Sequence, residues 1–282
     1  MRTRPTSAGG GGGGNARPVA VGAAWSRVRG LWEARRVFRL LVVRDLKVRY
    51  AGSALGWLWS VLDPLLMAAV YWFVFTVVLD QSLGLSPYIV FLLAALLPWT
   101  WFNGAVTDTA RALRVDEKLV RSTNVHREVW VLRLVASKGI EYLCSLPVLA
   151  LFAVLYQAEL HWQVVLLPLA FVLQCTLLAG IGLLLAPLVV LVRDLERVVR
   201  IVLRLWFYVT PVIYGSVDIP EAYQAVFALN PLTGIFSLYR GTFFPGEVDW
   251  ALVGISAVES LAVLLIGWAV FARLERTVLK EI

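Results

Sequence analysis

The sequence predicts an all-α, polytopic membrane protein with six transmembrane helices and both termini on the cytoplasmic side. Apolar residues make up 60% of the 282 residues and charged residues only 16%, which is outside the usual range of soluble proteins. The apolar residues also gather in runs of about 20, the length at which a helix crosses a hydrocarbon core of about 30 Å. A water-soluble class is thereby excluded. The net charge of +7 is explained by basic segments beside the spans rather than by nucleic-acid binding.

Residues 1–30 are predicted to be a disordered extension rich in Gly and Arg. They include six consecutive glycines and scattered arginines, and such a composition cannot bury enough apolar surface to fold. The glycines are not a P-loop, because no Lys-Ser or Lys-Thr follows them here or elsewhere in the chain. We therefore expect no nucleotide cofactor bound to this chain.

Residues 31–50 are predicted to form an amphipathic helix in the cytoplasmic interface. At 100° per residue, Phe38 and Leu41 share the apolar face, while Arg36, Arg44 and Lys47 share the opposite one. A basic helix of this kind lies with its apolar stripe in the acyl boundary and its cations at the phosphates. Two readings stay open, a simple membrane anchor and a part of a transport path.

Six apolar runs follow and define the predicted spans. A basic edge at residues 44–49 precedes the first run and keeps the N-terminus inside, since Lys and Arg are retained on the cytoplasmic side. All 26 Lys and Arg residues except Arg240 lie in or beside segments that this topology assigns to the inside. The predicted spans are residues 54–79, 88–106, 139–156, 162–192, 201–214 and 251–272.

Residues 219–245 are predicted to be re-entrant helices before the last span. The segment has prolines at 220, 231 and 245 among apolar pieces too short to cross a bilayer. Irregular backbone at membrane depth must be covered by protein or line a cavity.

Three carboxylates fall within predicted spans: Asp63, Glu141 and Glu259. Ionisable groups in a bilayer are costly and usually face a bundle interior, a partner or water. Each is therefore a functional candidate. For Asp63 and Glu141 we favour a structural interpretation: Asp63 is followed by Pro64 about nine residues into its span and Glu141 lies near a cytoplasmic end, so both can be solvated or hydrogen-bonded to the backbone.

Aromatic residues are abundant, with 12 Trp, 9 Tyr and 13 Phe. Trp57, Tyr71 and Phe75 share one face of the first span on a helical projection. Their rings could line a conduit and slide along the C–H surfaces of sugars, although interface belts also use such residues. The candidate channel residues are Trp57, Tyr71, Phe75, Trp99, Trp101, Phe102, Trp206, Phe207 and Tyr208.

Four segments carry a resemblance to a known family: RDLKVRYAGSALGWLWSVLDP, STNVHREVWVLRL, RDLERVVRIVLRLWFYVTPVIY and NPLTGIFSLYRG. In this order they resemble the membrane subunit of ABC-2 type polysaccharide exporters, the permeases of O-antigen, teichoic acid and actinobacterial galactan export. The resemblance makes residues 31–282 one ABC-2 type transmembrane domain in a bacterial inner membrane. The Ala-, Val- and Arg-rich composition suggests a high-GC actinobacterium. In such a bacterium the resemblance implies a lipid-linked galactan as the cargo.

The resemblance further implies a homodimer around a glycan channel, two copies of a separate nucleotide-binding subunit that holds ATP and Mg, and a polyprenyl-pyrophosphate-linked substrate. By the same resemblance, residues 31–50 form a cytoplasmic gate, with Arg44, Lys47, Arg49 and Tyr50 as its residues. The loop 109–127 contains the coupling helix that docks on the ATPase, with Asp116, Glu117, Lys118 and Arg121 as contacts. Residues 219–245 form the external gate.

Arg44, Lys47 and Arg49 lie where the interface helix meets the first span, at the depth of a lipid headgroup. Cations there attract a lipid pyrophosphate, worth about 1 kcal/mol each. The alternative is that these residues only fix the topology of the span.

Two other classes are considered. An ABC-2 drug or small-molecule exporter would share the spans and the coupling helix without a wide aromatic conduit. A membrane enzyme would need a clustered carboxylate, histidine or metal site. His126 and His161 are the only histidines, on opposite predicted sides, and Cys144 and Cys175 fall inside apolar runs without metal-ligand spacing. We therefore expect a transport subunit, not an enzyme, with no catalytic residue and no metal.

Overall fold

The computed structural model of the chain describes residues 33–50, 52–53, 55–78, 87–123, 125–215 and 218–281. The predicted disordered extension, residues 1–30, lies outside the described residues, as do the side chains of Tyr50 and Trp57. Within the part that is described, every regular element is helical.

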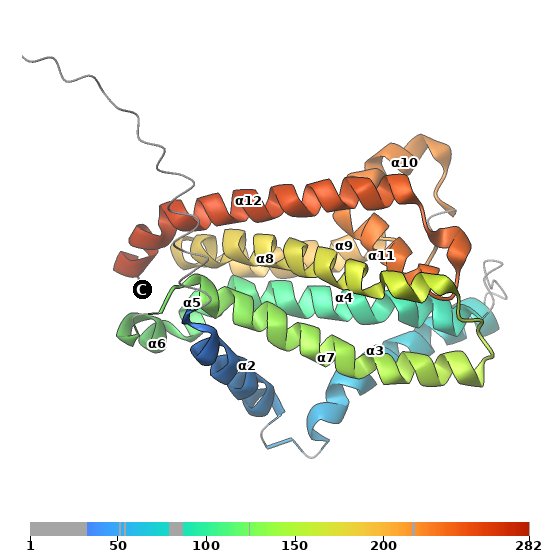
Figure 1. Cartoon of the computed structure of the whole chain (residues 1–282), viewed down its shortest axis with the longest axis horizontal. Helices are drawn as coiled ribbons and strands as arrows, with labels where there is room; N and C mark the ends of the chain where they lie inside the picture. The colour runs from blue at the N-terminus through green and yellow to red at the C-terminus, as the bar shows by residue number, and fades with distance from the viewer. Residues whose placement is uncertain are drawn as a thin grey trace, which may run out of the picture.

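Four long helices form the body of the molecule (Figure 1): α4 (Tyr88–Ala110), α7 (Glu128–Leu155), α8 (Leu167–Leu191) and α12 (Trp250–Glu281). Each is long and apolar enough to cross a membrane, α8 together with the 3-10 turn Trp162–Leu166 that precedes it. They correspond to the second, third, fourth and sixth predicted spans. α4 is buried along most of its length because α3, α7, α8, α9 and α11 all pack against it.

α7 begins at Glu128, well before the predicted start at residue 139. Its first half carries Arg133 and Lys138, whose charges argued for a loop. In the folded chain Arg133 is buried against carboxylates and Lys138 lies 3.0 Å from Glu141, so the charged turns can remain helical and packed.

The tightest packing lies between α8 and α12, where two glycines meet. A Cβ built on Gly267 would lie 2.1 Å from the carbonyl oxygen of Gly180, and one built on Gly180 would lie 2.5 Å from the backbone nitrogen of Leu264. Only hydrogen atoms fit at both positions. Small residues at such crossings let helix backbones approach closely inside a membrane.

The first predicted span is not one continuous α-helix, and the fifth is displaced toward the N-terminus of the chain. The first consists of α3 (Trp59–Trp72), preceded by the 3-10 turn Gly56–Leu58 and continued by a π-helical stretch, Phe73–Val78. The fifth is α9 (Leu195–Val209), which starts before residue 201 and stops before residue 214. α9 stops because Thr210 precedes Pro211 and is extended, with φ −84° and ψ 138°, as a residue before proline prefers.

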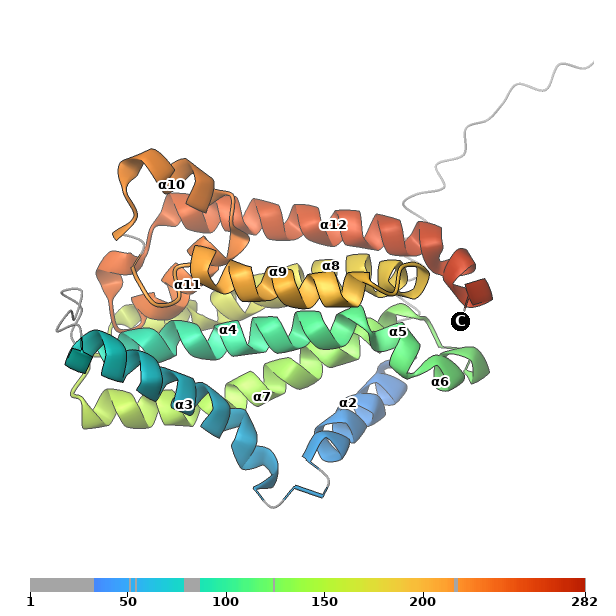
Figure 2. The same ribbon diagram turned by 180° about the vertical axis from the view of Figure 1, so that it is seen from behind.

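The remaining helices occupy the two ends of the bundle (Figure 2). α5 (Ala112–Val115), α6 (Glu117–Ser122) and the C-terminal end of α12 lie at one end, with α2 (Arg35–Tyr50) nearby. α10 (Glu221–Ala228), α11 (Pro231–Gly241) and the 3-10 turn Pro245–Glu247 lie at the other end. We call these the α6 end and the α10 end.

α11 is buried at every residue, although it is too short to span a membrane. It begins with Pro231, and the Asn230 side chain accepts a hydrogen bond from the Leu232 backbone N–H at 3.1 Å. Arg240 at its end is 1% exposed and donates to the carbonyl oxygens of Val212 at 2.6 Å and Tyr214 at 2.8 Å. The Arg240 guanidinium also lies 3.7 Å from the ring centre of Phe91, so this buried cation ties α11 to α4 and to the chain after α9.

Candidate functional site

A groove of about 620 Å³ runs between α3, α4 and α9. These three helices lie together on the face of the bundle seen in Figure 2. Its lining residues come from α3 (Asp63, Pro64, Met67, Tyr71), α4 (Leu96, Trp99, Thr100, Asn103, Thr107) and α9 (Arg200, Leu203, Arg204, Phe207, Tyr208). This groove is the candidate functional site.

The part of the groove nearer the α10 end is aromatic. Tyr71 of α3 stacks on Phe207 of α9 with ring centres 5.8 Å apart, and Trp99 of α4 meets Phe207 edge-on at 5.3 Å. Tyr208 is 59% exposed and lies edge-on to Phe207 at 5.2 Å. The faces of these rings are apolar, although the tyrosines and the tryptophan also carry a polar group at the ring edge, and such faces suit contact without tight binding.

The part nearer the α6 end is polar. Asn103 and Thr107 follow Trp99 at intervals of four residues, so they continue the same face of α4 toward α5. Arg200 and Arg204 lie on α9 before the aromatic pair Phe207 and Tyr208, and the start of α9 is tied to α5 by the Arg114–Glu196 ion pair at 3.2 Å. The groove therefore changes from polar to aromatic along its length.

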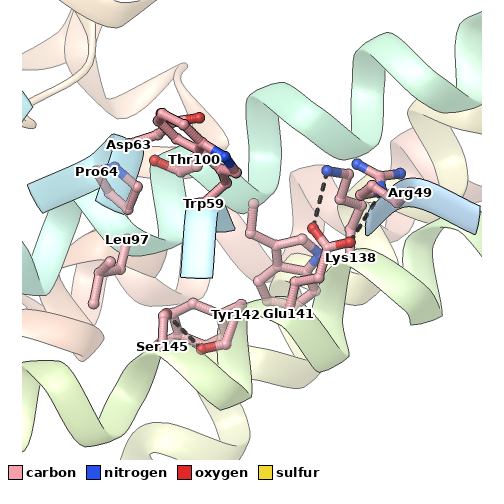
Figure 3. A pocket seen from close by; sticks show the side chains of 11 residues that line it. Arg49, Trp59, Asp63, Pro64, Leu97, Thr100, Lys138, Glu141, Tyr142 and Ser145 are labelled. Atoms are coloured by element: carbon pink, nitrogen blue, oxygen red, sulfur yellow. Dashed lines mark hydrogen bonds and ion pairs between the residues drawn. The ribbon is translucent and has the colours of Figure 1, made fainter. Parts of the chain in front are cut away.

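A second cavity of about 260 Å³ adjoins the groove and shares Asp63, Pro64 and Thr100 with it. Figure 3 shows Glu141 between the cations of Arg49 and Lys138. The Arg49 Nε lies 3.1 Å and the Lys138 Nζ 3.0 Å from the Glu141 carboxylate. Arg49 also donates to Asp108 at 2.6 Å, so this cluster fixes the end of α2 against α4 and α7.

A third hollow, of about 630 Å³, lies between α2, α5 and α7. Arg133 of α7 is 2% exposed and contacts both Asp45 of α2 and Asp116, which lies between α5 and α6. Arg44 of α2 contacts Asp116 as well, at 3.0 Å. Burial disfavours the charge of Arg44, but the carboxylates of Asp116 and Asp45 outweigh burial and raise its pKa. These four charges, which we call the Arg133 network, join α2 and α7 to the turn between α5 and α6.

The structure separates the predicted channel residues into two groups. Tyr71, Trp99, Phe207 and Tyr208 line the groove. The others pack elsewhere among the described side chains: Phe75 against Tyr88 at 5.9 Å, Trp101 on Phe171 at 4.7 Å, Phe102 on Trp99 at 5.5 Å and Trp206 through a hydrogen bond to Asn230 at 3.1 Å. The side chain of Trp57 lies outside the described part.

The predicted gate and coupling residues also divide. Arg44 and Arg49 are ion-paired with carboxylates, whereas Lys47 is exposed. Asp116 points into the Arg133 network, whereas Glu117, Lys118 and Arg121 are exposed on α6. Of the four predicted coupling residues, Glu117, Lys118 and Arg121 are therefore accessible on α6 and Asp116 is not.

The candidate carboxylates and cysteines have different surroundings. Asp63 is exposed and lines both the groove and the adjoining cavity, Glu141 is in the Arg49 cluster, and Glu259 is half-buried on α12. Cys144 and Cys175 are free thiols. Within the part of the chain that the structure describes, no group of three His, Cys, Asp or Glu residues is placed to hold a metal ion.

Sequence reasoning missed Asn103, Thr107, Arg200, Arg204 and the Arg133 network. The first two could have been found, because they extend the stripe of Trp99 at helical spacing. The sequence places Arg200 in a cytoplasmic loop and Arg204 close to the start of the fifth span. In the structure both lie within α9, which begins at Leu195 rather than at residue 201.

Comparison with known proteins gives the same class. The chain matches the ABC-2 type transporter family over residues 36–244. It is 34% identical over 244 residues to the O-antigen export system permease protein RfbA of Klebsiella pneumoniae, covering 85% of this chain and 93% of that protein. RfbA of Myxococcus xanthus is 33% identical over 244 residues, with 86% of this chain and 92% of the relative covered. The polysialic acid transport protein KpsM of Escherichia coli is 22% identical over 244 residues, with 85% and 93% covered.

A bundle of long apolar helices is the structure of a membrane-embedded protein. The chain belongs to the ABC-2 type transporter family and is a multi-pass protein of the inner membrane. The family that the four sequence segments predicted is thereby confirmed.

Proposed function

We propose that this chain is the permease subunit of an ATP-driven exporter that moves a polysaccharide linked to a polyprenyl pyrophosphate out of the cytoplasm. The observation that carries the proposal is the groove between α3, α4 and α9, whose aromatic part offers ring faces to sugar surfaces. The printed names of the relatives, O-antigen export and polysialic acid transport, support a polysaccharide cargo. The particular glycan that we propose is a galactan, because the Ala-, Val- and Arg-rich composition suggests a high-GC actinobacterium.

The proposal includes a homodimer that encloses the path. The groove is open along one side, and apolar residues are exposed beside it on both flanking helices. Contiguous exposed apolar surface of this kind marks a contact with protein or lipid. The exposed residues are Leu66, Met67 and Val70 on α3, Phe73 in the π-helical stretch that continues it, and Ile201, Val202, Leu205 and Val209 on α9. A second copy against these faces would turn two open grooves into one closed conduit.

The proposed topology has six spans with both termini in the cytoplasm. α3 with its π-helical continuation and α9 serve as the first and fifth spans, and α10 and α11 as re-entrant helices at the outer end. Lys and Arg residues concentrate toward the α6 end, which supports that end as the cytoplasmic one.

Energy is proposed to come from two copies of a separate ATPase subunit that hold ATP and Mg. No P-loop occurs in the sequence, so the chain needs a nucleotide-binding partner. α6 presents Glu117, Lys118 and Arg121 at the proposed cytoplasmic end, where such a subunit would dock.

Export by groove variants tests the proposal. Tyr71→Ala with Tyr208→Ala removes two rings from the groove, and we expect surface polysaccharide per permease to fall about tenfold, as the loss of two ring contacts would cost. Tyr156→Ala is the matched control, because Tyr156 is also exposed, at 46%, but lies at the end of α7 away from the groove. Equal export by both variants at equal expression would refute a role of the groove.

A further inference from the structure

α9 carries arginines at a spacing that places them on one side of the helix. Arg197, Arg200 and Arg204 follow at intervals of three and four residues, and Tyr208 comes four residues later. The four positions fall within about 80° of one another at 100° per residue. We call them the arginine stripe. It runs from the polar part of the groove to the aromatic part.

The stripe lies between two other faces of α9. Val199, Leu203 and Phe207 are buried toward the bundle, while Ile201, Val202, Leu205 and Val209 are exposed and apolar. Arg200 and Arg204 therefore emerge at the groove, on the boundary between the buried face and the face proposed to meet a second copy. A helix that only had to pack in a membrane would gain nothing from cations at this position, where charge is costly.

The charges around the stripe do not balance. Glu196 is shared by Arg200 at 2.7 Å and Arg114 at 3.2 Å, and Asp63 is the carboxylate of α3 that lines the groove. Among the described residues, Arg197 and Arg204 form no ion pair. Arg114 and the three arginines of the stripe carry four positive charges against the two carboxylates Glu196 and Asp63, and Arg193 and Asp194 directly before α9 add one charge of each sign. Two positive charges remain. Arg44 and Arg49 of α2, by contrast, are each paired with carboxylates outside the groove.

Neutral donors complete the surroundings. Asn103 and Thr107 of α4 line the same part of the groove, and their amide and hydroxyl groups can donate to an oxygen-rich anion. Arg204 lies nine residues after the first residue of α9, about 14 Å along the helix at 1.5 Å per residue. An anion drawn from the α6 end would thus pass Arg197 and Arg200 before it reaches Arg204 and the aromatic rings.

We propose that the arginine stripe of α9, with Asn103 and Thr107, is a binding site for the pyrophosphate of the lipid carrier inside the groove. Guanidinium groups match phosphate oxygens in geometry and stay charged at any physiological pH. The site deepens the proposed function and rests on it, because the groove is taken as the cargo path. It places the pyrophosphate headgroup inside the groove. The sequence alone predicted that Arg44, Lys47 and Arg49, at the end of α2, attract this headgroup.

Binding of a fluorescent polyprenyl pyrophosphate to the full chain in neutral phosphatidylcholine nanodiscs tests the site. In Arg200→Gln/Arg204→Gln we expect the dissociation constant to rise by roughly thirtyfold, as the loss of two cations near a phosphate predicts. Arg276→Gln/Lys280→Gln is the matched control: it removes two exposed cations at the end of α12, outside the groove, and should leave binding unchanged. Arg200→Lys/Arg204→Lys retains the charges and should bind more tightly than the Gln pair.

Two further probes separate the possible sources of binding. A polyprenol without pyrophosphate should bind weakly and equally to all variants; if it lost affinity in the Gln pair as the pyrophosphate lipid does, the site would be apolar and the proposal wrong. Inorganic pyrophosphate should displace the lipid only weakly. If it bound as tightly as the lipid with the same dependence on Arg200 and Arg204, a soluble anion would be the ligand and the lipid assignment would be overturned.

Failure of this inference can be told from failure of the proposed function. Unchanged lipid binding in the Gln pair, together with lower export in Tyr71→Ala/Tyr208→Ala, would overturn the pyrophosphate site and leave the groove as a glycan path. Unchanged export in the aromatic variant would count against the path itself.

Discussion

Arg133 is the residue on which three segments of the chain converge. It is almost completely buried on α7 and neutralises Asp45 of α2 and Asp116 beside α6. A buried cation between two carboxylates adds little net stability over an apolar contact, but removal of one partner leaves charges uncompensated. Arg133 thereby holds α2 and the turn before α6 against α7.

Replacing Arg133 therefore has a predictable cost. We expect Arg133→Gln to lower the free energy of unfolding by about 3 kcal/mol, at the lower end of values for broken buried pairs, because Arg44 still contacts both carboxylates. The measurement is thermal unfolding of the purified protein in detergent. Arg121→Gln serves as control, since its pair with Glu117 is exposed and 3.7 Å long, and should change little.

A second variant separates charge from packing at this position. Arg133→Met combined with Asp45→Asn and Asp116→Asn removes the three most buried charges of the network and leaves only Arg44, whose side chain is 36% exposed and can be solvated, so it should recover much of the stability lost in Arg133→Gln. No recovery in the triple variant would show that Arg133 acts through its packing against Trp130, whose ring centre is 5.2 Å away, rather than through its charge.

At the scale of elements, the crossing of α8 and α12 depends on the absence of side chains. The backbones touch at Gly180 and Gly267, and a Cβ on Gly267 would lie 2.1 Å from a carbonyl oxygen that cannot rotate away. The helices would have to separate along their contact. This contact places α12 as a fixed support behind the helices that line the groove.

Gly267→Ala should thus destabilise the protein, by about 1–3 kcal/mol as for overpacked cores, seen as a lower midpoint of thermal unfolding. Gly254→Ala lies in the same helix and is the matched control, because a Cβ there meets nothing within 4 Å. The control should be neutral or slightly stabilising, as alanine favours helix over glycine by about 1 kcal/mol. Equal midpoints for the two variants would contradict the close crossing.

At the scale of the whole molecule, α6 is the exposed element at the proposed cytoplasmic end. Exchanging its charges in Glu117→Arg/Arg121→Glu keeps an oppositely charged pair within the helix but inverts what a partner meets. We expect co-purification with the ATPase subunit to be lost while the thermal midpoint stays unchanged. Glu159→Arg, an exposed reversal at the opposite end, should retain the partner. Retention by the exchanged pair as well would place the docking surface elsewhere.

The sequence could predict the long helices because length and hydropathy are local properties. It also predicted that residues 219–245 contain short helices, and α10 and α11 lie there. The Arg133 network could not be predicted, since Arg133 and Asp45 are separated by 88 positions and nothing local indicates their pairing. The apolar run predicts a span that continues to residue 214, but the helix ends at Val209 because Pro211 disfavours the helical conformation at Thr210.

The candidate site was predictable only in part, for a related reason. Aromatic residues were chosen by type, but helix packing decides which of them face the groove: Phe207 and Tyr208 line it, whereas neighbouring Trp206 turns to Asn230. Lining by Asn103 and Arg204 arises only when α4 and α9 pack side by side.

Photo-crosslinking during export is the sharpest test of whether polysaccharide passes through the groove between α3, α4 and α9, as we propose. A photoreactive phenylalanine analogue replaces Tyr208 in the groove or, as control, Tyr156 at the end of α7, in cells that make the glycan. With an active ATPase, we expect illumination to attach glycan to the chain at position 208 and little glycan at position 156. Without an active ATPase, we expect no attachment at position 208. Equal attachment at both positions, or attachment only at 156, would contradict passage through the groove.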